Sequence, residues 1–168
     1  ISIMYICIMK AVVIKTTGNK YEVKNEQGDI FYCRLKGSFR IKEINSTSPV
    51  VVGDYVKLNF DLEEVMIVEL LPRKNKIVRK SVNLSKRSHV LAANVDQAML
   101  MITLQDPITT TAFIDRFLIS ANANNIQVVL IFNKLDLYDD VLLAKQKLLK
   151  QVYEKIGYST FSLSILQD

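Results

Sequence analysis

The chain has 168 residues, a length that fits one domain or two small ones. Its 22 basic and 17 acidic residues give a net charge of +5, and its 49% hydrophobic and 23% charged residues are typical of a globular protein, which excludes disorder, collagen and coiled coil as descriptions of the whole chain. Two cysteines, Cys7 and Cys33, and a single histidine, His89, argue against a disulfide scaffold, a zinc site or a histidine-based catalytic site within this chain.

The first nine residues, Ile1 to Met9, are apolar but fall well short of the ~20 residues of a membrane span. They lack the basic region and the cleavage site of a secretory signal. Met4 and Met9 are both possible starts, so we expect residues 1–8 to be either a product of gene-start choice or an extension that pairs with the first strand. No targeting signal and few cysteines together predict a cytoplasmic protein with no membrane partner.

Five short segments in the first 71 residues have the composition of β-strands, and turn residues such as Gly18-Asn19 separate them. The predicted strands are residues 11–16, 21–24, 30–35, 50–60 and 65–71. Residues 36–49 are polar, have no helical period and are predicted to form a loop. Five strands without a substantial helix predict a small closed barrel of the OB or SH3 type over residues 1–71. Such barrels commonly bind oligonucleotides.

The positive charge is concentrated in one segment. Residues 1–71 contain nine basic and nine acidic residues, residues 72–92 contain seven basic and no acidic ones, and residues 93–168 contain six basic and eight acidic ones. We interpret residues 72–92 as a basic linker, which is either simply solvated or a site that attracts nucleic acid. The candidate nucleic-acid-binding residues here and near the third strand are Arg34, Lys36, Phe39, Arg40, Lys42, Arg73, Lys74, Arg79 and Lys80.

Aromatic residues near these cations could stack on bases. Phe31 and Tyr32 are neighbours on a predicted strand and therefore face opposite sides, so at least one of them belongs to the core. Phe39, in the predicted loop, is the better candidate for an exposed ring.

Residues 93–168 change to an alternation of strands and helices. The predicted strands are residues 97–104, 126–132 and 158–164, and the predicted helices are residues 109–125 and 141–156. Threonines 109–111 are candidate N-caps of the first helix, and Asp139 or Asp140 of the second. The order strand–helix–strand–helix–strand predicts a parallel sheet covered by helices, with right-handed crossovers.

A four-residue motif, Asn133-Lys134-Leu135-Asp136, directly follows the apolar strand IQVVLIF. Ligands of open α/β sheets bind at the carboxyl ends of the strands. A carboxylate at Asp136 can accept hydrogen bonds from the ring N–H and the amino group of guanine, a donor pair that adenine lacks. The Asn133 amide can reach the base and tie neighbouring loops, and the Lys134 stem can lie along the ring. In the alternative interpretation these are ordinary turn and cap residues.

A GTPase also needs a phosphate loop of the form G-x-x-x-x-G-K-[ST]. The five glycines of the chain do not form one; they are Gly18, Gly28, Gly37, Gly53 and Gly157. In the usual GTPase order this loop precedes N-K-x-D, whereas here a β-rich, basic region occupies that place.

This combination resembles the RsgA (YjeQ) family of ribosome small-subunit-dependent GTPases, in which the GTPase domain is circularly permuted. The resemblance extends from Met9 over nearly the whole chain. The segments that carry it are residues 13–23 (VIKTTGNKYEV), 33–40 (CRLKGSFR), 49–56 (PVVVGDYV), 73–80 (RKNKIVRK), 92–97 (AANVDQ), 114–118 (IDRFL) and 133–136 (NKLD).

The resemblance implies a five-stranded OB-fold barrel followed by the first βαβαβ portion of a circularly permuted P-loop GTPase domain over residues 93–168. It implies a GTP-hydrolysing assembly factor that binds the small ribosomal subunit and its rRNA, and we expect a monomer. It places guanine contacts at Asn133, Lys134 and Asp136. A second base-contacting loop would fall at Leu163-Ser164, where leucine replaces the first serine of the family pattern.

The family's remaining sites have no matching positions in this sequence. These are the phosphate loop, the switch regions, the Mg²⁺ ligand that accompanies GTP or GDP, and the ligands of a carboxy-terminal Zn²⁺ domain. We therefore expect a chain that is truncated before the phosphate loop and has no GTPase activity of its own.

A different class of function remains open at this point. The chain could be a non-catalytic RNA-binding module in which the α/β part supports the barrel and N-K-L-D is only a turn. Preference for GDP over ADP that depends on Asp136 would distinguish the two. A metabolic nucleotide-binding enzyme is disfavoured, because the sequence has neither a phosphate loop nor a catalytic histidine or carboxylate pair.

Overall fold

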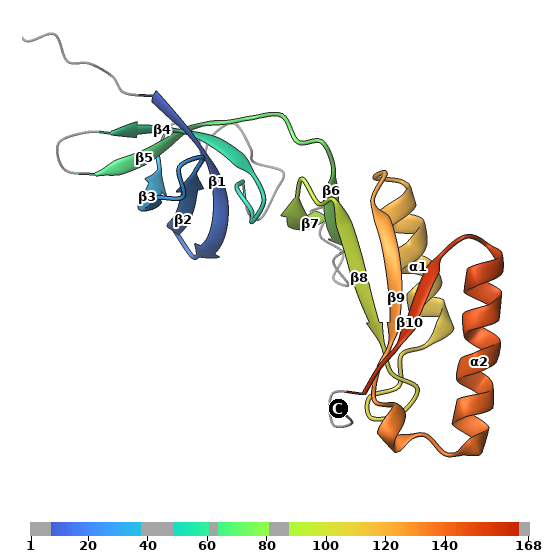
Figure 1. The fold of residues 1–168 in the computed structure, drawn as a ribbon. Coiled ribbons are helices and arrows are strands. Elements are labelled where there is room, and N and C mark those ends of the chain that lie inside the picture. Colours follow the sequence, from blue (N-terminus) through green and yellow to red (C-terminus); the bar gives the residue numbers. More distant parts are fainter. Residues whose placement is uncertain (1–7, 38–48, 61–63, 81–87, 165–168) are drawn as a thin grey trace, which may run out of the picture. The chain divides into compact units, whose positions relative to one another are not determined.

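The computed structural model describes residues 8–37, 49–60, 64–80 and 88–164 of the chain. The chain divides into two compact units, Ile1–Val95 and Asp96–Asp168, and each is described by itself (Figure 1). Three of the residues proposed for nucleic-acid binding, Phe39, Arg40 and Lys42, lie outside the described residues, as do residues 1–7 of the expected amino-terminal extension.

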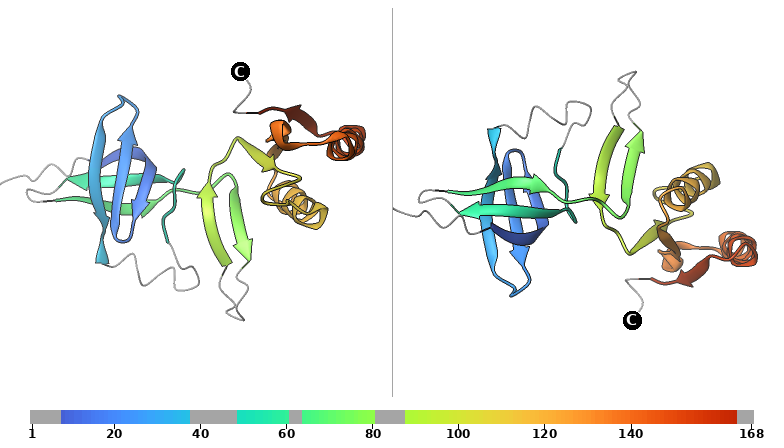
Figure 2. Two further views of the ribbon diagram at one scale, coloured as in Figure 1. Left: turned by 90° about the horizontal axis from the view of Figure 1, so that it is seen from below. Right: turned by 90° about the horizontal axis from the view of Figure 1, so that it is seen from above.

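A closed five-stranded barrel forms most of the first unit (Figure 1, Figure 2). Its strands are β1 (Ile8–Thr17), β2 (Lys20–Asn25), β3 (Ile30–Leu35), β4 (Tyr55–Phe60) and β5 (Val65–Leu70). They follow the order β1-β2-β3-β5-β4, and β1 closes the barrel by pairing with β4. Only β3 and β5 are parallel. The predicted five-stranded barrel is confirmed, although β1 begins earlier than predicted because Ile8, Met9 and Lys10 pair with β4.

Alternating side chains of the strands fill the barrel. Val13, Val23, Val56, Leu58 and Ile67 are almost completely buried, which is the period-two pattern of a strand with one apolar face.

The two adjacent aromatic residues of β3 separate as their alternation requires. The Phe31 ring packs against the core, with its centroid 5.3 Å from that of Phe60 in an edge-to-face contact. Tyr32 is 74% exposed on the outer face. Tyr32, and not Phe31, is therefore the ring of this strand that is accessible to a ligand.

The segment predicted to be a linker contains a β-hairpin. Strands β6 (Lys76–Lys80) and β7 (Ser88–Ala93) pair in an antiparallel arrangement. Val78 packs against a small buried cluster of Val51, Val90 and Ala93. The boundary between the units consequently lies between Val95 and Asp96, whereas the sequence placed a linker at residues 72–92. The sequence analysis missed this hairpin because lysines and arginines outnumber the few apolar residues, such as Val78 and Val90, that form its core.

The second unit is a parallel sheet with two helices, as predicted. In chain order its elements are β8 (Gln97–Ile102), α1 (Thr111–Asn122), β9 (Gln127–Phe132), the short 3₁₀ helix η2 (Leu135–Leu137), α2 (Asp140–Lys155) and β10 (Ser159–Ser162). Strand β9 lies between β8 and β10 and is parallel to both. Both helices cover the same face of the sheet, because right-handed crossovers between sequential strands require it (Figure 2).

Local capping explains where the two helices begin. The Thr110 side chain accepts a hydrogen bond from the Phe113 N–H at 3.3 Å, and the Asp139 carboxylate accepts one from the Leu142 N–H at 2.8 Å. Gly157, with φ of +97°, follows the end of α2 in a conformation that favours glycine. The strands β8, β9 and β10 all end at the same edge of the sheet, so the segments that follow them lie close together.

None of the helices in the described ranges combines the length and the hydropathy that crossing a membrane would demand.

Candidate functional site

The first residue of the N-K-L-D motif still takes part in the pairing of β9 with β8. The Asn133 N–H donates to the Ile102 carbonyl at 2.9 Å, so the pairing of β9 with β8 continues one residue beyond the strand. The Asn133 side chain is buried: its Oδ1 accepts the Lys134 N–H at 2.8 Å and its Nδ2 lies 3.4 Å from Met101 Sδ. The amide thus joins the start of the motif to Met101 in strand β8, while its expected contacts with a base and with neighbouring loops stay predictions.

Lys134 forms a second link between these segments. Its backbone has φ of +65°, a left-handed conformation that is uncommon for residues other than glycine. Its Nζ donates to the Asp106 carbonyl, in the loop between β8 and α1. The ammonium group is therefore held by the protein, and the stem of Lys134 is fixed beside the motif.

Asp136 and Ser164 meet although they are far apart in the sequence. The Ser164 hydroxyl donates to the Asp136 carboxylate, and both residues are half-buried. The Leu163 N–H donates to the Phe132 carbonyl at 2.9 Å, so leucine at this position leaves the backbone pairing intact. A carboxylate has about four acceptor positions, so one bond from Ser164 leaves capacity for the two donors of a guanine.

The structure therefore brings all four expected base-binding residues to one edge of the sheet. Asn133, Lys134 and Asp136 come from the segment after β9, and Ser164 from the segment after β10. Their contacts with a base remain predictions, whereas their mutual hydrogen bonds are properties of the fold.

Tyr138 is a residue of this site that the sequence analysis missed. Its hydroxyl accepts the Leu104 N–H at 2.8 Å and donates to the Asn133 carbonyl at 2.8 Å, and its side chain is buried. The phenol therefore joins the segment after β8 to the motif by two hydrogen bonds. The available signal was an aromatic residue directly before the Asp139 cap, two residues after the motif.

One of the proposed RNA-binding cations is engaged inside the first unit. Arg73 Nε and Nη2 donate to the two carboxylate oxygens of Asp54, each at 2.7 Å, and Nη2 also donates to the Pro49 carbonyl at 3.1 Å. Asp54 is fully buried and accepts the Val51 N–H at 2.8 Å. Removing one partner of such a buried pair costs about 3–5 kcal/mol, because the other charge is left uncompensated. Arg73 thus has a structural task, and its contact with RNA stays a prediction.

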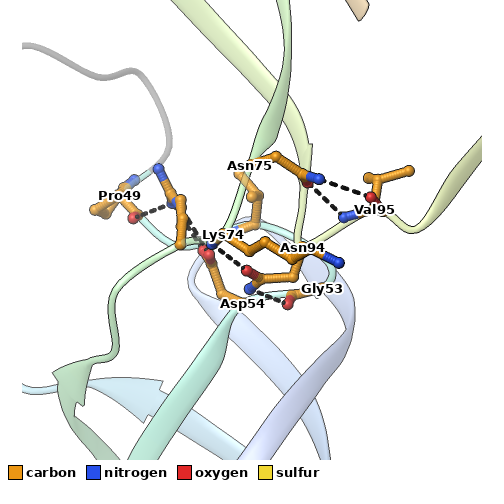
Figure 3. Close-up of polar contacts among 9 residues, drawn as sticks. Pro49, Gly53, Asp54, Lys74, Asn75, Asn94 and Val95 are labelled. Carbon is orange, nitrogen blue, oxygen red and sulfur yellow. Dashed lines mark hydrogen bonds and ion pairs between the residues drawn. The ribbon is translucent and has the colours of Figure 1, made fainter. Parts of the chain in front are cut away.

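Two asparagines add hydrogen bonds next to the Asp54–Arg73 pair, and we call these four residues the polar junction (Figure 3). The Asn94 side chain accepts the Lys74 N–H at 2.7 Å and donates to the Gly53 carbonyl at 2.8 Å. The Asn75 side chain accepts the Val95 N–H at 2.7 Å and donates to the Val95 carbonyl at 2.8 Å. The barrel and the β6–β7 hairpin are consequently joined by hydrogen bonds as well as by the chain.

The other cations predicted to bind nucleic acid differ in what the structure shows of them. Arg34 and Lys36 are exposed at the end of β3, and Arg34 Nη1 lies 3.6 Å from a carboxylate oxygen of Glu64. Lys74 is exposed beside the junction. The backbones of Arg79 and Lys80 belong to β6, and their side chains lie outside the described residues.

Comparison with protein families matches both parts of the chain. Residues 10–66 match the RsgA N-terminal domain, and residues 70–168 match the RsgA GTPase. Two similar curated proteins are both called small ribosomal subunit biogenesis GTPase RsgA. The one from Flavobacterium johnsoniae is 48% identical over 95% of this chain and 50% of its own length, and the one from Bacteroides fragilis is 49% identical over 94% and 51%. The chain thus spans about half the length of these relatives.

Solved structures agree with these matches. YjeQ from Thermotoga maritima superposes with a TM-score of 0.70 at 31% identity, covering 94% of this chain and 52% of that one. YloQ, described as a circularly permuted GTPase, superposes with a TM-score of 0.67 at 28% identity, covering 98% of this chain and 54% of that one.

Proposed function

The chain belongs to the RsgA GTPase family, and from this membership we propose that it takes part in GTP-dependent assembly of the small ribosomal subunit. Relatives that share its sequence are named small ribosomal subunit biogenesis GTPases. The observation that carries the proposal to this chain is the convergence of Asn133, Lys134, Asp136 and Ser164 at one edge of the sheet. GTP hydrolysis by the whole family protein, the ribosomal partner and a cytoplasmic, monomeric protein belong to this proposal, whereas the 168-residue chain alone is expected not to hydrolyse GTP.

The part of the function assigned to these residues is the recognition of guanine. Asp136 would accept the ring N–H and the exocyclic amine of the base. Adenine has no such pair of donors and would leave the carboxylate unpaired. Ser164 and the Lys134–Asp106 link hold the carboxylate and the lysine stem in place before the base arrives, which reduces the entropy lost on binding.

Metal ions enter the proposal only with the whole family protein. Mg²⁺ would accompany GTP or GDP at a phosphate loop, and Zn²⁺ would belong to a carboxy-terminal domain. In the described parts of this chain no three side chains of His, Cys, Asp or Glu gather as a metal site would need. We therefore assign no metal ligand among them.

The RNA-binding part of the proposal rests on the first unit. Its barrel has the OB topology, and it carries exposed cations such as Arg34 and Lys36. The polar junction around Asp54 and Arg73 joins the barrel to the basic hairpin, so the two can present one surface to a polyanion.

The test replaces the Asp136 carboxylate, which only accepts hydrogen bonds, by an amide, which can also donate them. Asp136→Asn should weaken binding of GDP to this chain by at least about tenfold, the loss of a charged acceptor pair. The same variant should gain binding of xanthosine diphosphate, whose C2 oxygen can accept from the new amide. Ligand-observed NMR with GDP, ADP and xanthosine diphosphate measures these weak affinities. Asp140→Asn is the matched control, since Asp140 carries the same charge in the exposed first turn of α2.

Two results would contradict guanine recognition. Equal binding of GDP and ADP by the unchanged chain would remove it, as would an Asp136→Asn variant that binds like Asp140→Asn. Retention of RNA binding in that case would favour the alternative of a non-catalytic RNA-binding module.

A further inference from the structure

Two cations face each other on the outside of the barrel. Lys20 on β2 and Arg34 on β3 are direct partners in the register of the two strands. Both are exposed, because their neighbours Tyr21 and Cys33 point into the core. Like charges directly opposite each other on a sheet destabilise it, so this pair reduces the stability of the isolated barrel. A bound anion would remove that cost.

The space beside this pair is a groove with room for part of a nucleic-acid strand. Its volume is about 700 Å³. The residues that line it are Thr17, Asn19, Lys20, Arg34, Leu35 and Gly37. Two cations, a hydroxyl and an amide are donors suited to phosphate oxygens, and none of the described residues that line the groove carries a carboxylate.

An exposed aromatic ring lies next to the cations. Tyr32 is on the same outer face of β3 as Arg34, two residues away and therefore ~7 Å along the strand. Its cross-strand partner is Glu22, whose carboxylate is paired with Lys15 Nζ at 2.8 Å. The carboxylate opposite this ring is thus already paired with a lysine. A ring that is 74% exposed beside such donors can receive a stacked base.

A carboxylate at the edge of this surface competes with a phosphate. Glu64 lies 3.6 Å from Arg34 Nη1, and both side chains are about half exposed. Exposed pairs of this kind contribute little to stability, so an incoming phosphate can displace the carboxylate.

We propose that this groove binds single-stranded RNA, with a phosphate held between Lys20 and Arg34 and a neighbouring base stacked on Tyr32. The inference rests on the RNA-binding part of the proposed function and deepens it. It names the ligand as an unpaired strand and adds Asn19, Lys20 and Tyr32 to the expected residues.

The test compares two lysines on the same face of the same strand. Lys20 and Lys24 are both exposed on β2, but the partner of Lys24 across the strands is Ile30. The probe is a fluorescein-labelled oligouridine of about 12 nucleotides, within the site size of one OB-like barrel, and fluorescence anisotropy reports its binding to the 168-residue chain. Lys20→Gln should weaken binding about threefold to tenfold. It should also reduce the steepness of the plot of log binding constant against log salt concentration by about 0.7. Lys24→Gln should change both by much less.

Two further variants separate a binding role from a structural one. Glu64→Gln should strengthen RNA binding, since it removes the competing carboxylate. Tyr32→Ala should weaken binding roughly tenfold, as expected for one stacked base. Without RNA, Lys20→Gln should be at least as resistant to urea as the unchanged chain, because it relieves the repulsion from Arg34.

The outcomes distinguish this inference from the proposed function. If the chain does not bind RNA, RNA binding and the groove both fail. If the chain binds RNA but Lys20→Gln and Lys24→Gln lower its RNA affinity equally, the proposal that the groove binds RNA is wrong. RNA binding by another surface then remains. Equal affinity for duplex RNA would also overturn the groove, since a duplex has no unpaired base for Tyr32.

Discussion

Gly53 shows how one residue can be fixed by a contact far away in the sequence. Its φ is +88°, and a Cβ atom placed on it would lie 2.0 Å from the Ala93 carbonyl oxygen. The Gly53 carbonyl itself accepts from Asn94. The glycine is therefore required both by its own turn and by the close approach of the strand β7.

This close approach can be measured with a pair of glycine substitutions. Gly53→Ala should lower the free energy of unfolding of the first unit by about 2–4 kcal/mol, because left-handed strain and a backbone clash act together. Gly18→Ala is the matched control. Gly18 also has a positive φ, of +59°, but nothing lies within 4 Å of its added Cβ. Urea denaturation of the two variants measures the difference, and equal losses would show that β7 does not press on Gly53.

Arg73 shows that amino-acid composition does not reveal which cation of a basic segment is paired inside the protein. It stands in a run of cations beside Lys74, and nothing local distinguishes the two. Only the return of the chain at Asp54 shows that the Arg73 guanidinium is committed to a buried carboxylate. An arginine suits this position because its planar group can bind both carboxylate oxygens at once.

At the scale of elements, the two helices of the second unit are joined by one polar contact. The Tyr153 hydroxyl on α2 donates to the Asp115 carboxylate on α1 at 2.9 Å, and Tyr153 is 4% exposed. Burial, with a further contribution from the hydrogen bond to Asp115, raises the pKa of Tyr153 from 10.0 to about 12. The folded state therefore holds this phenolic proton more tightly than the unfolded chain does.

This pKa shift predicts a dependence of stability on pH. Below pH 10.0 the phenol is protonated in both states and its contribution is constant. As the pH rises from 10.0 to about 12, the unfolded state loses the proton first and stability falls, by on the order of 2 kcal/mol. Tyr153→Phe should unfold in urea with a flatter dependence on pH in this range. Identical slopes for the two proteins would contradict the assignment.

The elements around the motif also depend on one another. The three segments after β8, β9 and β10 are joined by the side chains of Lys134, Tyr138 and Ser164. Each segment is short, and its conformation is set by hydrogen bonds to the next one. Base recognition is thus a property of the sheet edge as a whole.

At the scale of the whole molecule, the two proposed binding sites are built from residues of different units. The groove belongs to Ile1–Val95 and the motif to Asp96–Asp168. Substitutions that share no partner generally have additive effects.

This separation predicts independent responses in the chain. Lys20→Gln should leave the GDP affinity within about twofold of the unchanged chain, and Asp136→Asn should leave the oligouridine affinity within the same limit. A double variant should show the sum of the two free-energy changes. The anisotropy and NMR titrations above measure both. A coupling larger than about 0.5 kcal/mol would show that the units communicate.

The sequence by itself determined most of the elements of this protein. Eight of the strands, both helices, their caps and the place of N-K-L-D at a strand end follow from local periodicity, turn residues and capping, because each depends on neighbours within a few residues. The family resemblance followed from the same motifs, and the family matches confirm it.

Only the tertiary structure decided which distant residues are partners. The hairpin in the basic segment, the Asp54–Arg73 pair, the bridging phenol of Tyr138 and the opposed cations Lys20 and Arg34 all depend on strand register or on a return of the chain. A local pattern states which side of an element is buried or exposed. It does not state what lies against that side, because the partner is selected by packing over the whole unit.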